Sequence, residues 1–154
     1  MTAPRISIQR EGFDIAAESA RLKEGGDVGA VVTFTGVCRS EDGTLEALEL
    51  EHYPGMAEAE IGRIARDAFA RWPLSGVTVI HRYGLMRPGD DIVLVATAST
   101  HRHAAFQAAE FLMDFMKSRA PFWKKQHPSG DESGQWVDAR DTDQAALSRW
   151  DAEE

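Results

Sequence analysis

One stretch, residues 100–126, constrains the fold of this chain more than any other. It opens with the imidazole and guanidinium groups of His101, Arg102 and His103, and it closes on a lysine-rich turn beside two aromatic residues. Between these ends, apolar residues recur at helical spacing: Ala105, Ala109, Leu112, Met113 and Met116. This spacing predicts one long helix with a single buried face, so the remaining elements must supply the surface that covers it.

The segments before this helix alternate between strand and helix patterns. Strands are predicted over residues 5–10, 29–37, 45–53, 76–82 and 91–99, and helices over residues 15–23 and 54–72. Residues 29–37 are apolar on both faces and predict a buried strand, and residues 45–53 predict a half-exposed strand antiparallel to it. Ser99 or Thr100 is expected to cap the long helix, and Ala120-Pro121 to end it. A short strand over residues 135–139 and a helix over residues 142–150 complete the prediction.

Short loops join the predicted strand pairs, with Asp42-Gly43 as a hairpin signal and Pro88-Gly89 as a turn. Helices interleaved with hairpin-like strand pairs favour an α+β fold with a mostly antiparallel sheet and three to four helices over a doubly wound parallel sheet. A chain of 154 residues without a linker or repeat is expected to form one domain over residues 1–154.

Composition excludes several classes of protein. The formal net charge of -8 argues against a general nucleic-acid-binding protein, which is usually basic. The single cysteine, Cys38, excludes an internal disulfide and a zinc site built from cysteines. No segment has the pattern of a signal peptide or the roughly 18 apolar residues of a membrane helix, so a cytoplasmic location is expected.

The charges are unevenly distributed. Residues 117–127 contain four cations and no acid, whereas residues 128–154 contain eight acids and two arginines. A local basic patch on an acidic protein suggests a small anionic ligand or an acidic partner segment. The acidic segment, residues 128–154, is expected to pack on or flank the site.

The start of the long helix has the features of an anion site. Free backbone donors and the positive end of the helix dipole, with His101 and Arg102, could bind a phosphate or carboxylate; an exposed helix cap explains the same residues. Two imidazoles at positions 101 and 103 of a helix point about 200° apart, so they cannot share one ion there. At the end of a strand they could, but His52, His81 or His127 would have to supply further ligands, and these stand in unrelated parts of the sequence. We therefore predict no metal site and no cofactor.

The basic residues at the end of the helix allow two interpretations. Lys117 could cap the last turn, and Lys124 and Lys125 could be solvated. Alternatively, the apolar wall of residues 121–123 lowers the pKa of a neighbouring ammonium group and makes it a better proton donor or nucleophile. Arg39 follows a predicted strand on a loop, a common position for a residue that contacts an anion. For Cys38, a structural thiol is favoured over a nucleophile, because no base lies nearby in the sequence.

The two ends of the helix are too far apart to share one small ligand. Arg102 and Lys117 are fifteen residues apart, which corresponds to roughly 22 Å along a straight helix. Either a second copy of the chain supplies one end of a shared site, or the two ends form unrelated sites.

Several segments together resemble one known family. The matching stretches are FTGVCR (34–39), LEHYPGMAE (50–58), RWPLSGVTVIHRYG (71–84), THRHAAF (100–106), FMKSRAPFWKK (115–125) and WVDAR (136–140). In this order and spacing they resemble the large, catalytic subunit of molybdopterin synthase. The resemblance spans nearly the whole chain, although the loop after Arg39 is shorter than is usual in that family.

The resemblance implies a fold, a reaction and a set of partners. The expected fold is an α/β-hammerhead with additional β structure. The expected enzyme is a sulfurtransferase of molybdenum cofactor biosynthesis, which converts cyclic pyranopterin monophosphate into molybdopterin. Its two sulfurs would come from the C-terminal thiocarboxylate of a small ubiquitin-like subunit. Two large subunits would form a homodimer within a heterotetramer.

The resemblance also assigns roles to residues. Lys117 and Lys124 match the essential lysines of the family, and Arg39, His101 and Arg102 match its anionic substrate pocket. Four further residues flank matched binding positions: Val37, Cys38, Lys125 and Gln126.

Two other functions remain as alternatives. A non-catalytic α+β module could bind an acidic peptide tail or a phosphorylated ligand through the same basic patch. A phosphate-ester hydrolase would need a metal or a nucleophile–base pair, and neither is evident in the sequence.

Overall fold

The computed structural model of the chain describes residues 3–119, 121–128, 135–137 and 150. Within them it has three helices and eight strands. The helices are α1 (Ile15–Leu22), α2 (Met56–Arg71) and α3 (Arg102–Ser118). The strands are β1 (Arg5–Gln9), β2 (Ala30–Val37), β3 (Leu45–His52), β4 (Leu74–Arg82), β5 (Gly84–Met86), β6 (Asp91–Ser99), β7 (Phe122–Pro128) and β8 (Gln135–Val137).

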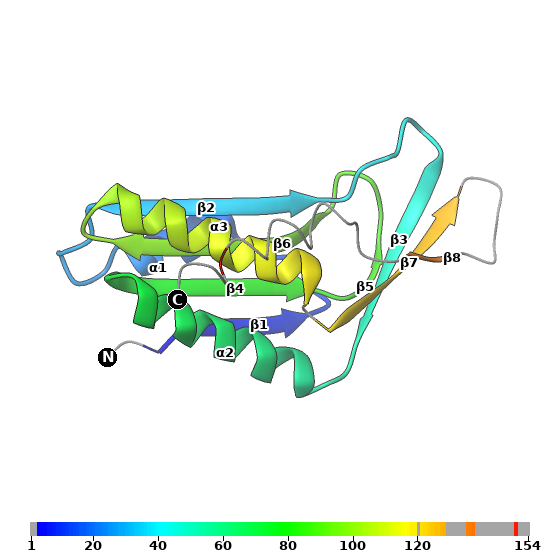
Figure 1. Cartoon of the computed structure of the whole chain (residues 1–154). Helices are drawn as coiled ribbons and strands as arrows, with labels where there is room; N and C mark the ends of the chain where they lie inside the picture. The colour runs from blue at the N-terminus through cyan, green and yellow to red at the C-terminus, as the bar shows by residue number, and fades with distance from the viewer. Residues whose placement is uncertain (1–2, 120, 129–134, 138–149, 151–154) are drawn as a thin grey trace.

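The larger layer is a four-stranded sheet in the order β1-β4-β6-β2. Its strands pair antiparallel except for β1 and β4, which are parallel. Helices α2 and α3 lie side by side across one face, and the shorter α1 lies behind the other (Figure 1). This arrangement confirms an α+β fold with mostly antiparallel pairing.

The main core lies between this sheet and the two long helices. Alternate residues of β4 and β6 point toward the helices, as the period of two along a strand requires. The buried residues that meet there include Val77, Val79, Val93 and Val95 from the sheet and Ile61, Phe111, Leu112 and Phe115 from the helices. The apolar stripe predicted for α3 is therefore confirmed, since all five of its members are buried.

A second four-stranded sheet, β5-β3-β7-β8, stands at one end of the molecule (Figure 1). All its pairings are antiparallel. It has a small core of its own, formed by Cys38, Leu45, Leu48, Leu50 and Met86. The chain thus has a long layered body and a separate sheet at its end, and the candidate site lies where the two meet.

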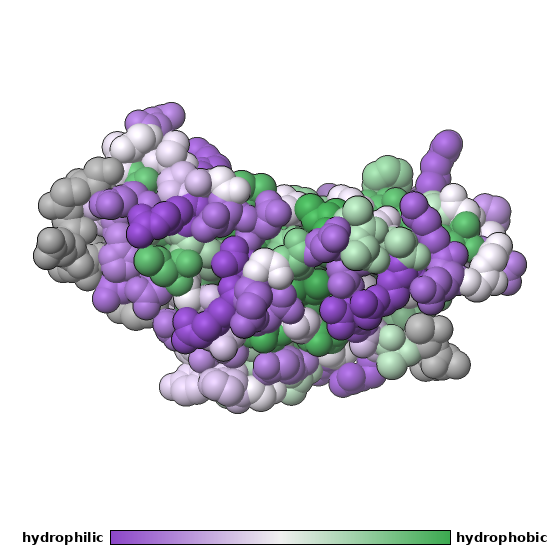
Figure 2. All heavy atoms as spheres, turned by 180° about the vertical axis from the view of Figure 1, so that it is seen from behind, coloured by the Kyte–Doolittle hydropathy of each residue, from purple (hydrophilic) through white to green (hydrophobic). Residues whose placement is uncertain are grey.

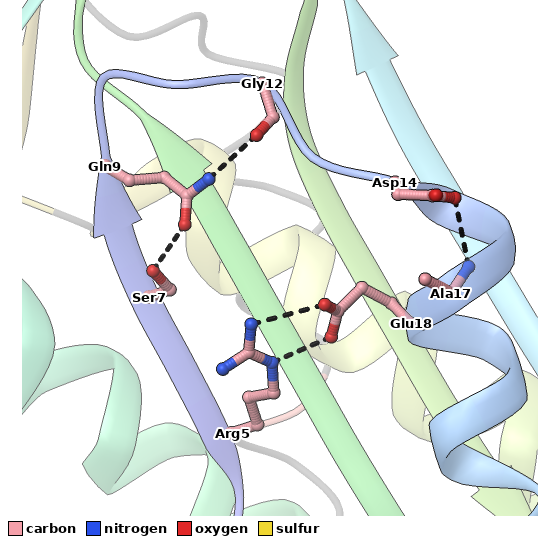
Figure 3. Close-up of polar contacts among 7 residues, drawn as sticks. All are labelled: Arg5, Ser7, Gln9, Gly12, Asp14, Ala17 and Glu18. Carbon is pink, nitrogen blue, oxygen red and sulfur yellow. Dashed lines mark hydrogen bonds and ion pairs between the residues drawn. The ribbon is translucent and has the colours of Figure 1, made fainter.

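The N-terminal segment is held by a few polar contacts (Figure 3). Asp14 caps α1 and accepts a hydrogen bond from the backbone of Ala17 at 3.0 Å. Glu18 is 7% exposed and accepts two bonds from Arg5, at 2.7 Å from Nε and 3.2 Å from Nη2. A paired guanidinium is the partner that a buried carboxylate needs, so this contact fixes α1 against β1.

The structure overturns two predictions about β2. The sequence predicted a buried strand paired with residues 45–53, but β2 is the edge strand of the larger sheet and is only partly buried. Its single neighbour in the larger sheet is β6, while β3 belongs to the second sheet. A turn with positive φ at Glu41, Asp42 and Gly43 redirects the chain from one sheet to the other.

Other boundaries also differ. Residues 122–128 form a strand rather than the expected basic turn, and the three-residue β5 was not predicted. Helix α3 has His101 as its N-cap, without a side-chain capping bond, in place of Ser99 or Thr100. Met56, the first residue of α2, is 53% exposed. The predicted helix over residues 142–150 and most of the acidic segment lie outside the described residues.

Trp150 is the described residue nearest the C-terminus, and it is buried. Its indole packs edge-on against Trp72 and Phe111, and its Nε1 donates a 2.6 Å hydrogen bond to Asp114. These contacts hold Trp150 beside α2 and α3.

The face seen from behind has apolar patches between hydrophilic side chains (Figure 2). This is consistent with α1 being short, because eight residues cover only part of that face of the sheet. Among the described helices, none combines the length and the hydropathy of a bilayer-spanning segment.

Candidate functional site

Three elements end at the same edge of the larger sheet. Strands β2 and β4 both run antiparallel to β6, so their C-terminal ends lie together. Helix α3 begins after β6 and packs back along β6 and β2, so its last turn returns to that edge (Figure 1). The topology therefore places Val37, Arg82 and Lys117 at the junction with the second sheet.

Strand β7 separates the two adjacent lysines. Successive side chains of a strand point to opposite faces, and directly paired residues share a face. Phe122 pairs with His52 and Lys124 with Leu50, so these four lie on the face that carries the second core. Lys125 pairs with Glu49 on the other face. The predicted cluster of lysines is thus divided, and only Lys124 shares a face with Phe122.

Gln126 and Lys125 consequently have different surroundings. Gln126 pairs with Leu48 and follows Lys124 on the same face. On the other face, His127 lies 3.2 Å from the carboxylate of Glu49, directly beside Lys125. The face that holds Lys125 therefore carries acids opposite its cation, which makes it less suited to an anion.

Lys117 and Lys124 come together around one imidazole. The pKa of His81 is lowered to about 4, first by burial and then by the charges of Lys117, Lys124 and His52, against the raising effect of a hydrogen bond to the backbone of Arg82. The fold agrees: Lys124 follows two residues after Phe122, whose ring stacks on His81, and the last turn of α3 carries Lys117 to the same junction. Both lysine side chains are exposed, whereas His81 is 8% exposed.

An aromatic stack joins the two sheets beneath these lysines. The rings of His81 and Phe122 are parallel within 15°, with centroids 3.8 Å apart. His52 lies 6.0 Å from Phe122 and 4.4 Å from Tyr83. Its Nδ1 is buried and finds no hydrogen-bond partner among the described residues. Sequence reasoning missed both histidines, although each stands within a stretch that carries the family resemblance.

Arg39 and Val37 are accessible at the same edge. The Arg39 side chain is 69% exposed and lies 3.8 Å from Glu41, a distance at which an exposed pair contributes little. Val37 is 47% exposed. Arg39 is therefore able to turn toward an anionic ligand.

Cys38 is buried at this edge, and its predicted binding role stays a prediction. Its side chain is 3% exposed, and its backbone N–H and carbonyl are bonded to Asp90 and Gly89 at 2.8 Å each. Burial raises the pKa of the thiol, and the nearby carboxylates of Asp90 and Glu41 raise it further. Cys38 is thus a packed thiol of the second core, which agrees with the structural role that the sequence favours.

His101 and Arg102 lie at the opposite end of α3. Both side chains are exposed. The preceding residue is fixed, since the Thr100 hydroxyl donates to the carbonyl of Asp27 at 3.1 Å. Within one chain the structure does not bring these residues to Lys117, from which α3 separates them by roughly 22 Å.

The arrangement can bind anions and stabilise negative charge. Lys117 and Lys124 belong to two separate, well-packed elements at the junction, their charges act on the buried ring of His81, and Arg39 is exposed at the same edge. A search of the described residues finds no group of three or more histidine, cysteine or acidic side chains placed to hold a metal ion.

Comparisons with known proteins agree with one another. A family model described as "MoaE protein" matches residues 8–119. The molybdopterin synthase catalytic subunit of Mesorhizobium japonicum is 64% identical over 149 residues, which cover 96% of this chain and 94% of that protein. The subunit of the same name from Escherichia coli is 47% identical over 153 residues, which cover 97% of this chain and 100% of that protein.

Solved structures show the same similarity. Molybdopterin cofactor biosynthesis protein E from Burkholderia multivorans is 44% identical with a TM-score of 0.83, and the match covers 97% of this chain and 98% of that one. Molybdopterin synthase from Staphylococcus aureus is 30% identical with a TM-score of 0.77, and the match covers 90% of this chain and 98% of that one.

Proposed function

The chain belongs to the MoaE protein family, and from this premise we propose that it is the catalytic subunit of a molybdopterin synthase. Its reaction is the conversion of cyclic pyranopterin monophosphate into molybdopterin, in molybdenum cofactor biosynthesis. The sulfur donor is the C-terminal thiocarboxylate of a small ubiquitin-like subunit, and two sulfurs are transferred for each product. The large subunits form a homodimer within a heterotetramer, and the cytoplasmic location stays a prediction.

The observation that carries this proposal is the meeting of Lys117 and Lys124 from two different elements. One stands on the last turn of α3 and the other on β7, yet both act on the same imidazole. Helix and strand positions hold the backbone more rigidly than a loop does, so both lysines extend from fixed points of the fold. Two fixed cations fit a thiocarboxylate, which is an anion throughout the physiological pH range.

Within this site we assign separate roles to the two lysines. Lys117 polarises the thiocarboxylate, or the adduct that it forms with the pterin, by stabilising the negative charge that develops on oxygen or sulfur. Lys124 serves as a proton donor from the other side of the junction. Arg39 contacts the phosphate at the rim, together with His101 and Arg102 from the second protomer. Val37 and Gln126 border the site, and Lys125 lies on the far face of β7.

The proposal is tested by turnover of the reconstituted complex. Purified chain is incubated with pterin precursor and thiocarboxylated small subunit, and formation of the dithiolene product is measured. Lys117→Ala should reduce the rate by on the order of a hundredfold or more while the dimer stays folded, because it removes a charge partner of the transition state.

Two results would count against the proposal. Near-normal turnover by Lys117→Ala would show that Lys117 does not take part in catalysis. Binding of the small subunit by wild-type protein, without any dithiolene product, would favour the non-catalytic module.

A further inference from the structure

The inference concerns His81, a residue to which the family resemblance gives no role. It is the penultimate residue of β4, at the edge where the larger sheet meets the second sheet. Its ring is covered by Phe122, which belongs to β7, two residues before Lys124 and on the same face of that strand. The imidazole is therefore a polar group at the junction that carries Lys117 and Lys124, where an apolar residue would satisfy packing alone.

The hydrogen bond of His81 fixes which ring nitrogen carries the proton. Nδ1 lies 2.8 Å from the carbonyl oxygen of Arg82. A carbonyl oxygen only accepts, so in the neutral ring Nδ1 holds the hydrogen and donates it. Nε2 consequently keeps its lone pair and is a hydrogen-bond acceptor.

The surroundings keep the ring neutral. Burial and the charges of Lys117, Lys124 and His52 all lower the pKa of His81, to about 4, while the bond to Arg82 opposes them only in part. At neutral pH the ring is thus an uncharged acceptor beneath two ammonium groups. An acceptor suits these groups, since an ammonium has three donors and no lone pair.

We propose that His81 is a positioning residue, whose Nε2 accepts a hydrogen bond from an ammonium group of the Lys117–Lys124 pair and orients that pair toward the thiocarboxylate. The expected effect of His81 on turnover rests on the proposed function. The proposed hydrogen bond between His81 and a lysine would be a property of the folded chain, so it can be tested separately from turnover. Because the ring stays uncharged, it holds the lysines without adding a third positive charge that would repel them.

Two variants separate positioning from packing. His81→Phe keeps a ring that can stack on Phe122 but removes the acceptor. His81→Gln loses the stack but can place an amide oxygen near the position of Nε2, so it retains the acceptor. If His81 serves packing alone, the phenylalanine variant is the better substitute; if it positions the lysines, the glutamine variant is. His127→Gln is the matched control, since His127 lies on the opposite face of β7 against Glu49.

The first measurement does not depend on activity. The rates at which acetic anhydride modifies Lys117, Lys124 and Lys125 are followed across pH by mass spectrometry, on the full chain. In His81→Phe, at least one of Lys117 and Lys124 should react about threefold or more faster at neutral pH, because loss of an acceptor favours the free amine. His81→Gln should stay closer to wild type, and Lys125 should not change. Unchanged reactivity of both lysines in the phenylalanine variant overturns the proposal, even if the wild-type enzyme is active.

The second measurement is steady-state turnover by the complex with the small subunit. His81→Phe should lower kcat by on the order of tenfold or more with little change in KM for the pterin, and His81→Gln should recover part of the loss. Normal kcat in the phenylalanine variant, or a larger loss in the glutamine variant, overturns the positioning role. Absence of product with wild-type protein would instead refute the proposed function, and the labelling result would still decide whether His81 holds the lysines.

Discussion

At the scale of single residues, His81 shows how one side chain links stability to pH. Its pKa is lowered to about 4, mainly by burial, so protonation of the folded chain is unfavourable. The unfolded chain takes up that proton near the ordinary pKa of about 6.5. Between these two values the unfolded state binds more protons than the folded state, so stability falls as the pH is lowered.

This predicts a measurable loss of stability in mild acid. From pH 7 to pH 4, His81 should reduce the free energy of unfolding by about 3 kcal/mol, and none of this loss should occur above about pH 7. Denaturant unfolding of wild type and His81→Phe at both pH values measures the difference. The variant should lack this part of the pH dependence; identical pH dependence in the two proteins would show that the folded ring titrates normally.

At the scale of elements, β7 decides which basic residues act together. A turn would have allowed Lys124 and Lys125 to face the same ligand, but a strand sends them to opposite faces. The paired residues make the two faces chemically different: Lys124 stands with His52 and Phe122, and Lys125 stands with Glu49. One strand therefore places two adjacent lysines in chemically different surroundings.

The alternation predicts unequal effects of two neighbouring substitutions. Lys124→Ala should reduce turnover by on the order of a hundredfold, as expected for a group that acts in the transition state. Lys125→Ala should reduce it by roughly tenfold or less, through weaker attraction of anions to the surface. Initial rates at saturating precursor and small subunit provide the comparison. Equal losses in both variants would contradict the division of the strand.

The elements differ in how well the sequence predicted them. Strands β4 and β6 and the buried face of α3 have long, regular apolar patterns, and these were predicted nearly to the residue. Strand β7 was not, because lysines, a tryptophan and a preceding proline have the local composition of a turn. Its strand structure depends on pairing with β3, more than seventy residues earlier in the chain.

The candidate site was predicted only in part, because it too depends on residues that are far apart in the sequence. Lys117, Lys124 and Arg39 stood out as cations in unusual local surroundings, and the structure places them near one junction. Cys38 has neither a charge nor unusual neighbours in the sequence, and its side chain is buried in the second core. His81 was overlooked because a histidine at the end of an apolar strand looks local and structural. Only the fold shows that α3 and β7 bring their lysines to it.

At the scale of the whole molecule, α3 keeps two groups of predicted site residues apart. Arg102 begins the helix and Lys117 lies in its last turn. One chain cannot bring both to the same small ligand, so a shared site needs two chains placed with the start of one α3 near the end of the other. In the proposed homodimer such a pairing would form two equivalent sites.

Subunit exchange tests this arrangement. Arg102→Ala and Lys117→Ala homodimers, each inactive alone, are mixed under conditions in which exchange is verified by mass spectrometry. A mixed dimer contains one intact site if the residues come from different protomers, so about a quarter of wild-type activity should return when exchange is random. Exchange without any recovery would place both residues in the same protomer's site or in unrelated sites.

The packing of Cys38 has a consequence for a protein proposed to handle reactive sulfur. A thiolate exposed beside a thiocarboxylate would compete for the transferred atom or trap the donor in a covalent dead end. Here the one thiol of the chain is enclosed by Leu45, Leu48, Leu50 and Met86, and its raised pKa keeps it in the unreactive protonated form. The one thiol of the chain is thus kept from competing for sulfur, which suits the proposed transfer to the substrate.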